Sequence, residues 1–245
     1  MKFMGSKASV SKYLLPIITK NLEPDQYYIE PFVGGCNMID KLSHSKRIGL
    51  DLNGYLISMW KGIQNKEELL HEIPKTTYSL YRDKYNKCKV PTEYSYDNFM
   101  IGWVGFMASF NGRFYDGGYS GHSAGKTNRN YIREQITNTL KSSELLGDVE
   151  FYHTSYSDFN YPKNSVIYCD KPYNNTKQYS VSKDFDEDKF WEWARTMTRD
   201  GHQVFVSEYN APSDFKCIWE KKVTVSLNTK KSKRATEKLF IYVPK

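Results

Sequence analysis

A carboxylate, an extended backbone position and an aromatic ring follow one apolar run of the sequence. The run Val166–Cys169 predicts a buried strand, and Asp170, Lys171, Pro172 and Tyr173 follow it directly. The carboxylate of Asp170 and the main-chain carbonyl of Lys171 could accept the two N–H bonds of a planar exocyclic amine. The nitrogen lone pair would then point at an electrophilic methyl group, and the ring of Tyr173 could stack on a base turned out of a duplex. We therefore predict a catalytic site at residues 170–173, with a simple strand-ending turn as the structural alternative.

A glycine pair and a later acid indicate a site for a nucleoside-bearing cofactor. Gly34 and Gly35 follow the apolar run Tyr27–Ile29, and such a turn lets backbone N–H groups approach a ligand closely. Asp51 ends the next predicted strand, where an acid can accept hydrogen bonds from ribose hydroxyls. The complete dinucleotide fingerprint is absent, since no third glycine follows at the required distance. A tight packing turn and a helix-capping aspartate are the alternatives for these two features.

The elements that must position these residues follow the pattern of a parallel sheet with crossover helices. Residues 27–65 predict a strand, the glycine loop, a helix near 37–43, a second strand and a helix capped by Asn53. The later elements are expected to be strands at 149–152, 166–169 and 204–207, a helix at 186–199, and an antiparallel strand pair at 222–227 and 238–243. The fold class is therefore α/β, with a mostly parallel twisted sheet and an antiparallel C-terminal strand.

The middle of the chain departs from this pattern and supplies a candidate recognition segment. Helices are expected near 66–72, 78–87, 96–109 and 129–145. A glycine-rich, aromatic loop at 110–128 lies between the last two. A loop of this length inside a compact domain is usually functional. Arg113 could contact guanine or phosphate, Asn111 adenine, and Tyr115 a base surface by stacking or wedging.

Basic residues beside this loop predict phosphate contacts. Lys126, Arg129 and Arg133 are assigned to phosphates, with Arg129 and Arg133 expected on one helical face. The chain carries a net charge of +7, and residues 216–245 hold nine Lys and Arg against two Glu. This balance favours a nucleic-acid partner. The Lys230–Arg234 run could follow a DNA backbone or form a solvated hairpin turn.

Composition excludes several other classes of protein. No apolar run approaches the roughly 18 residues of a membrane span, and the N-terminus lacks the apolar core of a signal peptide, so a cytoplasmic protein is expected. The four cysteines include no Cys-x-x-Cys pair, and no histidine lies at zinc-finger distance. We therefore expect no metal site, and no obligate protein partner is evident.

Several segments, in order along nearly the whole chain, resemble the Dam-like family of DNA adenine methyltransferases, especially its bacteriophage members. The segments are Met1–Lys7, Pro31–Gly35, Asp51–Asn53, Phe110–Tyr115, Asp170–Tyr173, Ser207–Pro212 and Ala235–Phe240. The resemblance implies a Rossmann-like methyltransferase fold that transfers a methyl group from S-adenosyl-L-methionine to the N6 amine of a flipped adenine in double-stranded DNA. It also implies a catalytic domain at 1–59 and 147–245, with a helical and loop DNA-recognition insertion at 60–146. Both protection of phage DNA from restriction and host regulation fit such an enzyme, working in a bacterial cell or a phage-infected host.

The same resemblance implies a set of cofactor contacts. They are Phe3, Lys7, Phe32, Gly34, Asp51, Phe151, Tyr152 and Asp170. Lys7 would meet the methionine carboxylate, Asp51 the ribose, and Phe151 or Tyr152 the adenine. For Phe3 and Phe151 a plain core role is the alternative, and for Lys7 a solvated surface charge.

One position departs from the family pattern, because Lys171 stands where the motif usually has proline. The backbone carbonyl needed at this position is still present, and Pro172 restricts residue 171 to extended conformations. The side chain of Lys171 is expected to point toward solvent or a DNA phosphate. We expect an active adenine methyltransferase. The alternatives are a relative that methylates a cytosine amine or an RNA adenine, and a weakened or non-catalytic DNA- or cofactor-binding relative marked by Lys171.

Overall fold

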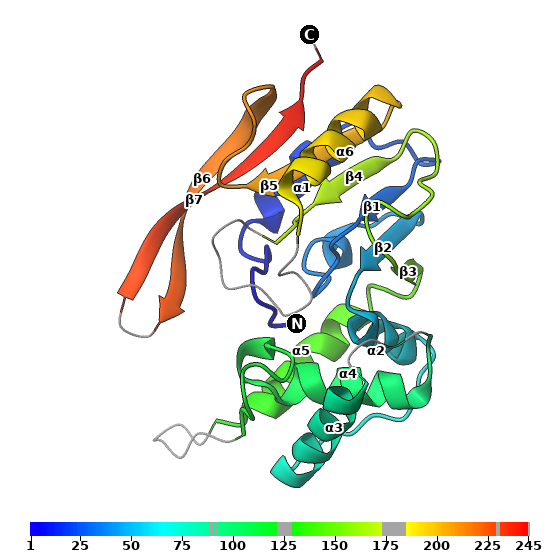
Figure 1. The fold of residues 1–245 in the computed structure, drawn as a ribbon, viewed down its shortest axis with the longest axis vertical. Coiled ribbons are helices and arrows are strands. Elements are labelled where there is room, and N and C mark those ends of the chain that lie inside the picture. Colours follow the sequence, from blue (N-terminus) through cyan, green and yellow to red (C-terminus); the bar gives the residue numbers. More distant parts are fainter. Residues whose placement is uncertain (89–90, 92, 122–128, 173–184, 229–230, 245) are drawn as a thin grey trace.

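A seven-stranded sheet in the order β3-β2-β1-β4-β5-β7-β6 forms the centre of the protein (Figure 1). The computed structural model describes residues 1–88, 91, 93–121, 129–172, 185–228 and 231–244. The strands are β1 (Tyr28–Glu30), β2 (Arg47–Asp51), β3 (Val149–His153), β4 (Val166–Cys169), β5 (Gln203–Glu208), β6 (Phe215–Asn228) and β7 (Lys231–Tyr242). Strands β1 to β5 are parallel, and β7 is antiparallel to both β5 and β6. The predicted α/β class, mostly parallel with an antiparallel C-terminal end, is confirmed, although the final strand pair is longer than expected.

The strand order reverses between β1 and β4. The chain proceeds outward from β1 to β2 and β3, and then returns to place β4 on the other side of β1. In the register of this pair, Tyr28 lies opposite Val166 and Ile29 opposite Ile167. Both strands are buried along their whole length, as expected for central strands covered on two faces. Such a reversal opens a crevice at the carboxyl ends of the strands, where ligands bind in open α/β sheets.

Helix α6 (Glu187–Arg199) packs against β5 and β7 and carries an apolar stripe of Phe190, Trp191, Ala194 and Met197. The side chain of its N-cap, Asp186, accepts a hydrogen bond from the Lys189 backbone N–H, as the acidic start of the predicted helix indicated.

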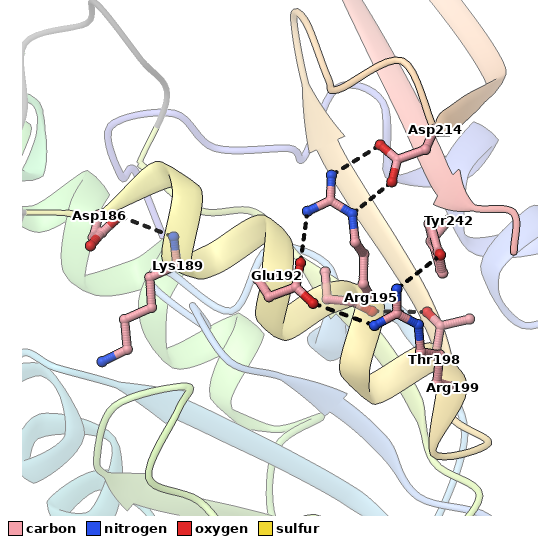
Figure 2. A network of polar contacts seen from close by, with 9 residues as sticks. Asp186, Lys189, Glu192, Arg195, Thr198, Arg199, Asp214 and Tyr242 are labelled. Atoms are coloured by element: carbon pink, nitrogen blue, oxygen red, sulfur yellow. Dashed lines mark hydrogen bonds and ion pairs between the residues drawn. The ribbon is translucent and has the colours of Figure 1, made fainter.

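A polar network ties α6 to the last two strands (Figure 2). Arg195 forms a two-pronged pair with Asp214, with distances of 2.6 Å from Nε to Oδ2 and 3.0 Å from Nη2 to Oδ1. Arg199 donates to the hydroxyl of Tyr242 at 3.2 Å, and Glu192 accepts from both arginines. Exposed single pairs stabilise little, but a bidentate arginine pair fixes relative orientation. The helix is therefore held in place along its C-terminal half.

A second group of helices lies beyond the carboxyl ends of the parallel strands (Figure 1). It consists of α2 (Gly54–Gln64), α3 (Lys75–Lys87), α4 (Tyr96–Ala108), the short η2 (Phe110–Gly112) and α5 (Tyr131–Ser143). Helix α4 is buried from Phe99 to Ala108, and α2, α3 and α5 all contact it. A helix that is apolar on all sides must occupy the centre of such a group. One hydrophobic cluster continues from these helices to the sheet. None of the helices in the described part of the chain is long and apolar enough to cross a membrane.

The local predictions fail at three places. The helix expected near 37–43 is only a 3-10 turn, η1 (Ile39–Lys41), and no helix forms at 66–72. There, Lys66 adopts a left-handed backbone conformation that ends α2, and the carbonyl of Leu70 accepts from the indole N–H of Trp103 at 3.0 Å. Helix α1 (Ser11–Ile18) was not predicted and contains Pro16, which ordinarily disfavours a helix interior.

Candidate active site

Asp170 follows β4 at the reversal of the strand order and pairs with a lysine from the N-terminal segment. The Nζ of Lys7 lies 2.9 Å from Oδ1 of Asp170 and 3.6 Å from Oε2 of Glu237 on β7. Lys7 is only 5% exposed, so the solvated-surface alternative for it is wrong. Burial raises the pKa of Asp170 to about 6, although Lys7 opposes the shift. Burial alone would lower the pKa of Lys7, but the attraction of Asp170 and Glu237 outweighs it and raises that pKa.

The glycine loop lies directly beneath the ring of Phe3. A Cβ atom at Gly34 would stand 2.8 Å from Phe3 Cε1, and one at Gly35 would stand 2.7 Å from Phe3 Cβ. Gly34 also adopts a positive φ of 47°, which glycine tolerates best. The carbonyl of Gly34 accepts from the indole N–H of Trp60 on α2 at 3.1 Å. The loop therefore needs glycine for a close approach, and it is bonded to the helix that follows β2.

Asp51 ends β2 with both carboxylate oxygens oriented by backbone donors. Its Oδ2 accepts from the Gly34 N–H at 3.1 Å, and its Oδ1 accepts from the Asn53 N–H at 2.9 Å. Asn53, not Asp51, caps α2, because its side chain accepts from the Leu56 N–H at 3.1 Å. Burial raises the pKa of Asp51 to about 6 against the effect of the two donors. The acid is therefore fixed beside the glycine loop.

The side chain of Lys171 does not point toward solvent, so that prediction is wrong. Its Nζ lies 2.6 Å from Oε2 of Glu208, the last residue of β5, and 2.7 Å from Oε2 of Glu187, the first residue of α6. Two carboxylates on neighbouring elements compensate the loss of water around the ammonium. Sequence reasoning gave Glu187 only the role of an acid in the first turn of the predicted helix. It included Glu208 in the family-like segment Ser207–Pro212 but assigned it no site role.

Three further predicted cofactor contacts occupy different surroundings. Phe32 packs with Tyr156 and the aromatic residues near α6, at a ring distance of 5.4 Å from Tyr156. Phe151 is 4% exposed and stacks on Trp60 with ring centroids 6.1 Å apart, as its core alternative requires. Tyr152 is 38% exposed. Adjacent strand residues face opposite sides of a sheet, so Phe151 and Tyr152 cannot flank the same ligand from one face.

A further buried carboxyl group, that of Glu30, ends β1 beside the glycine loop. It accepts a hydrogen bond from the hydroxyl of Tyr28 at 2.9 Å, and burial raises its pKa to about 8. The sequence signal for Glu30 was its position after an apolar run, but no function was assigned to it. Among the described residues, no group of three or more His, Cys, Asp or Glu side chains could hold a metal ion.

The loop after α4 closes on itself through backbone hydrogen bonds. Phe110 N–H donates to the Gly118 carbonyl at 2.9 Å, and Ser109 pairs with Tyr119. Asn111 is exposed with a positive φ of 55°, and Arg113 is half-buried. These two predicted DNA contacts therefore both lie in the segment closed between Ser109 and Tyr119.

Tyr115 differs from the other predicted DNA contacts, because it is 8% exposed and packs among the helices. Its hydroxyl donates to the carbonyl of Ile101 at 2.9 Å, and its ring stacks on Tyr85. We therefore correct its assignment from DNA contact to core packing.

Two arginines lie at the start of α5, one before the helix and one on its first turn. Arg133 is exposed on the first turn, whereas Arg129 precedes the helix and its N-cap Asn130, so the two do not share a helical face. The guanidinium of Arg129 donates to Glu134 in a two-pronged pair and lies over the ring of Tyr131. Lys126, Tyr173 and Lys230 lie outside the described residues, as do the side chains at 231–234.

The parallel sheet, the reversal of its strand order and the acid-ended strands around a glycine turn define a Rossmann-like methyltransferase fold. Residues 3–231 match the sequence model of one family, and the chain belongs to it: the D12 class N6 adenine-specific DNA methyltransferases. The resemblance seen in the sequence is thereby confirmed.

Individual relatives agree with this membership. The chain is similar to the DNA adenine methylase of Salmonella typhi, with 28% identity over 189 residues that cover 71% of this chain and 64% of that protein. The DNA adenine methylase of Salmonella typhimurium matches to the same extent. The Type II methyltransferase M.FokI of Planomicrobium okeanokoites is 20% identical over 197 residues, which cover 71% of this chain and 28% of that protein. The matched part thus spans less than two thirds of the length of these curated relatives.

Proposed function

We propose that the protein transfers a methyl group from S-adenosyl-L-methionine to the N6 amine of a flipped adenine in double-stranded DNA. The observation that carries this proposal is the position of Asp170. Its carboxylate lies at the carboxyl end of β4, where the strand order reverses, and it is paired with Lys7 at 2.9 Å. Membership of the D12 class family supports the same reaction.

The residues around this crevice fit the chemical groups of the proposed cofactor. Asp51, held by two backbone donors, offers a fixed carboxylate for the ribose hydroxyls. Lys7 is a buried cation suited to the methionine carboxylate, and Gly34 allows the ring of Phe3, another proposed contact, to lie against the glycine loop. When bound, S-adenosyl-L-methionine supplies an electrophilic methyl group on a positively charged sulfur.

The chain itself activates the amine by accepting its hydrogen bonds. The adenine amine is a poor nucleophile because its lone pair is delocalised into the ring. Asp170 accepts one N–H and the carbonyl of Lys171 the other, which favours a pyramidal nitrogen with its lone pair available. No strong base is required, because the N–H becomes acidic once the nitrogen has gained the methyl group, and the carboxylate of Asp170 is placed to receive the proton.

Target recognition is assigned to residues 60–146, and the catalytic domain to 1–59 and 147–245. Arg113 and Asn111, both in the closed loop after α4, are the proposed base contacts. Arg133 and Arg129 are the proposed phosphate contacts, and Arg129 would have to exchange its pair with Glu134 for DNA.

Incubation with methyl-labelled S-adenosyl-L-methionine and mixed-sequence duplexes tests the proposal. Digestion to nucleosides should place the label on N6-methyladenine, and Asp170→Ala should abolish the transfer while leaving the thermal unfolding transition in place. Label on cytosine, or on RNA in preference to DNA, would identify a different substrate. Cofactor and DNA binding without any transfer would identify a non-catalytic relative. Transfer that persists in Asp170→Ala would show that another residue holds the amine.

A further inference from the structure

The ammonium of Lys171 is held by charge-assisted contacts from two elements. Its side chain is fully shielded from solvent, with Nζ 2.6 Å from Oε2 of Glu208 and 2.8 and 2.7 Å from the two carboxylate oxygens of Glu187. These lengths are typical of strong N–H···O bonds between charged groups. The side chain therefore has little freedom to move independently of β5 and α6.

Aromatic rings enclose the same ammonium. Its Nζ lies 5.5 Å from the ring centroid of Phe185 and 5.6 Å from those of Phe190 and Trp191. At these distances the ring faces attract a cation, more strongly where water is excluded. The two carboxylates and three rings together form a site fitted to a lysine ammonium.

The carboxylate of Glu208 has a second partner, and Glu187 stands on an anchored helix. Glu208 accepts from the Tyr209 N–H through its second oxygen at 2.7 Å. Glu187 lies on the first turn of α6, and the pair between Arg195 and Asp214 anchors that helix to the start of β6 (Figure 2). Lys171 is therefore attached to parts of the protein that cannot shift easily.

We propose that the side chain of Lys171 is a positioning element for catalysis: its anchored ammonium fixes the direction of the Lys171 carbonyl that accepts the target amine. A buried ion pair contributes little net stability compared with apolar packing, so stability alone does not account for this arrangement. A proline at this position would restrict φ through its ring, and here the anchor takes over that restriction. The inference rests on the proposed function, since it gives the carbonyl the role assigned there.

The first test compares Lys171→Met with Lys189→Met. Lys189 lies on α6, and its exposed amine points away from the network in Figure 2, so its replacement is the matched control. We expect Lys171→Met to lower the single-turnover rate of methyl transfer at saturating cofactor and DNA by roughly 10- to 100-fold, the cost of a misplaced reacting group. The dissociation constant of S-adenosylhomocysteine should change less than about threefold, because the carbonyl does not bind the cofactor. An unchanged rate, or an equal loss of cofactor binding, would overturn the proposal.

A second set of variants covers the case in which Lys171→Met does not fold. Glu187→Gln removes one anchoring charge from a partly exposed position, and it should lower the rate several-fold with cofactor affinity retained. In the Glu187→Gln/Glu208→Gln background the anchor is absent, so there Lys171→Pro should transfer methyl faster than Lys171→Met. Equal rates for Lys171→Pro and Lys171→Met in that background, with Glu187→Gln at the wild-type rate, would show that Lys171 does not control the backbone direction.

The two proposals fail in different ways. If the wild-type protein transfers no methyl group to any nucleic acid, the proposed function is wrong. If the wild type transfers methyl groups and Lys171→Met does so equally fast, only the positioning role is wrong.

Discussion

The buried ammonium of Lys7 and the half-buried carboxylate of Asp170 form an ion pair with 2.9 Å between Nζ and Oδ1. Lys7 belongs to the N-terminal segment and Asp170 follows β4, so the pair joins the N-terminal segment to the sheet where the strand order reverses. Glu237 from β7 contributes a second carboxylate to Lys7 at 3.6 Å. Both ends of the chain thus contribute charges to one site, and these charges determine how it should respond to mutation and pH.

Replacing Lys7 should weaken cofactor binding specifically. Lys7→Met keeps the length of the side chain but removes the cation proposed to meet the methionine carboxylate. We expect the dissociation constant of S-adenosylhomocysteine to rise by roughly 10- to 100-fold, the equivalent of one hydrogen bond to a charged group. Calorimetric titration without DNA measures the change, and Lys12→Met on the exposed face of α1 is the control. Wild-type affinity in Lys7→Met would place the carboxylate elsewhere.

Cofactor binding should also weaken as the pH falls below about 6. Burial raises the pKa of both Asp51 and Asp170 to about 6, so both acids are ionised above this pH and become protonated below it. The protonated forms lose the charge that attracts ribose hydroxyls and the sulfonium. Titrations of S-adenosylhomocysteine and S-adenosyl-L-methionine between pH 5 and pH 8 should show the decline, steeper for the sulfonium compound. Asp170→Asn removes one of the two ionisations and should make the decline shallower. An affinity that stays constant down to pH 5 would contradict this assignment.

Strand ends could be predicted from the sequence because their signal is local. Apolar runs that finish at Asp51 and Asp170 place both acids at one sheet edge whenever the strands are parallel. The direction of Lys171 could not be predicted, because its partners Glu187 and Glu208 come from other elements and only the folded chain brings them together. The prediction for Tyr115 is wrong because its local sequence pattern is misleading. Its glycine-rich surroundings indicate an exposed loop, but the helices bury its ring.

The buried carboxyl group of Glu30 should make stability depend on pH. Its pKa is about 8 in the folded protein and near its ordinary 4.5 when unfolded. Between these values the unfolded chain gives up the proton first, so the unfolding free energy falls as pH rises, and the loss is complete above about pH 8. Glu30→Gln retains an acceptor for the Tyr28 hydroxyl and removes the ionisation. Its unfolding free energy should therefore exceed that of the wild type increasingly from pH 5 to pH 9, by up to a few kcal/mol.

The Glu150–Tyr152 pair on β3 provides a matched control for the pH dependence of stability expected from Glu30. The hydroxyl of Tyr152 donates to Glu150 at 2.5 Å in the same alternate-residue arrangement, but Glu150 is exposed. Glu150→Gln removes no desolvated charge, so denaturant titrations should give the same difference from wild type at pH 5 and pH 9. A Glu30→Gln advantage that does not grow with pH would mean that Glu30 stays ionised at no cost in the folded protein.

Substitutions at Arg113 and Arg133 should affect DNA binding differently, because Arg113 is proposed to contact a base and Arg133 a phosphate. Arg113 lies half-buried in the closed loop after α4, whereas Arg133 is exposed on the first turn of α5. Once methylation mapping has identified the target sequence, Arg113→Ala should weaken binding to it by about 1–3 kcal/mol and leave binding to random duplex nearly unchanged. Arg133→Ala should weaken both duplexes equally and reduce the slope of log affinity against log salt concentration by about 1. Fluorescence anisotropy at several salt concentrations measures both quantities. An equal loss on target and random DNA for Arg113→Ala would mean that this arginine holds a phosphate, because a phosphate contact carries no information about the base beside it.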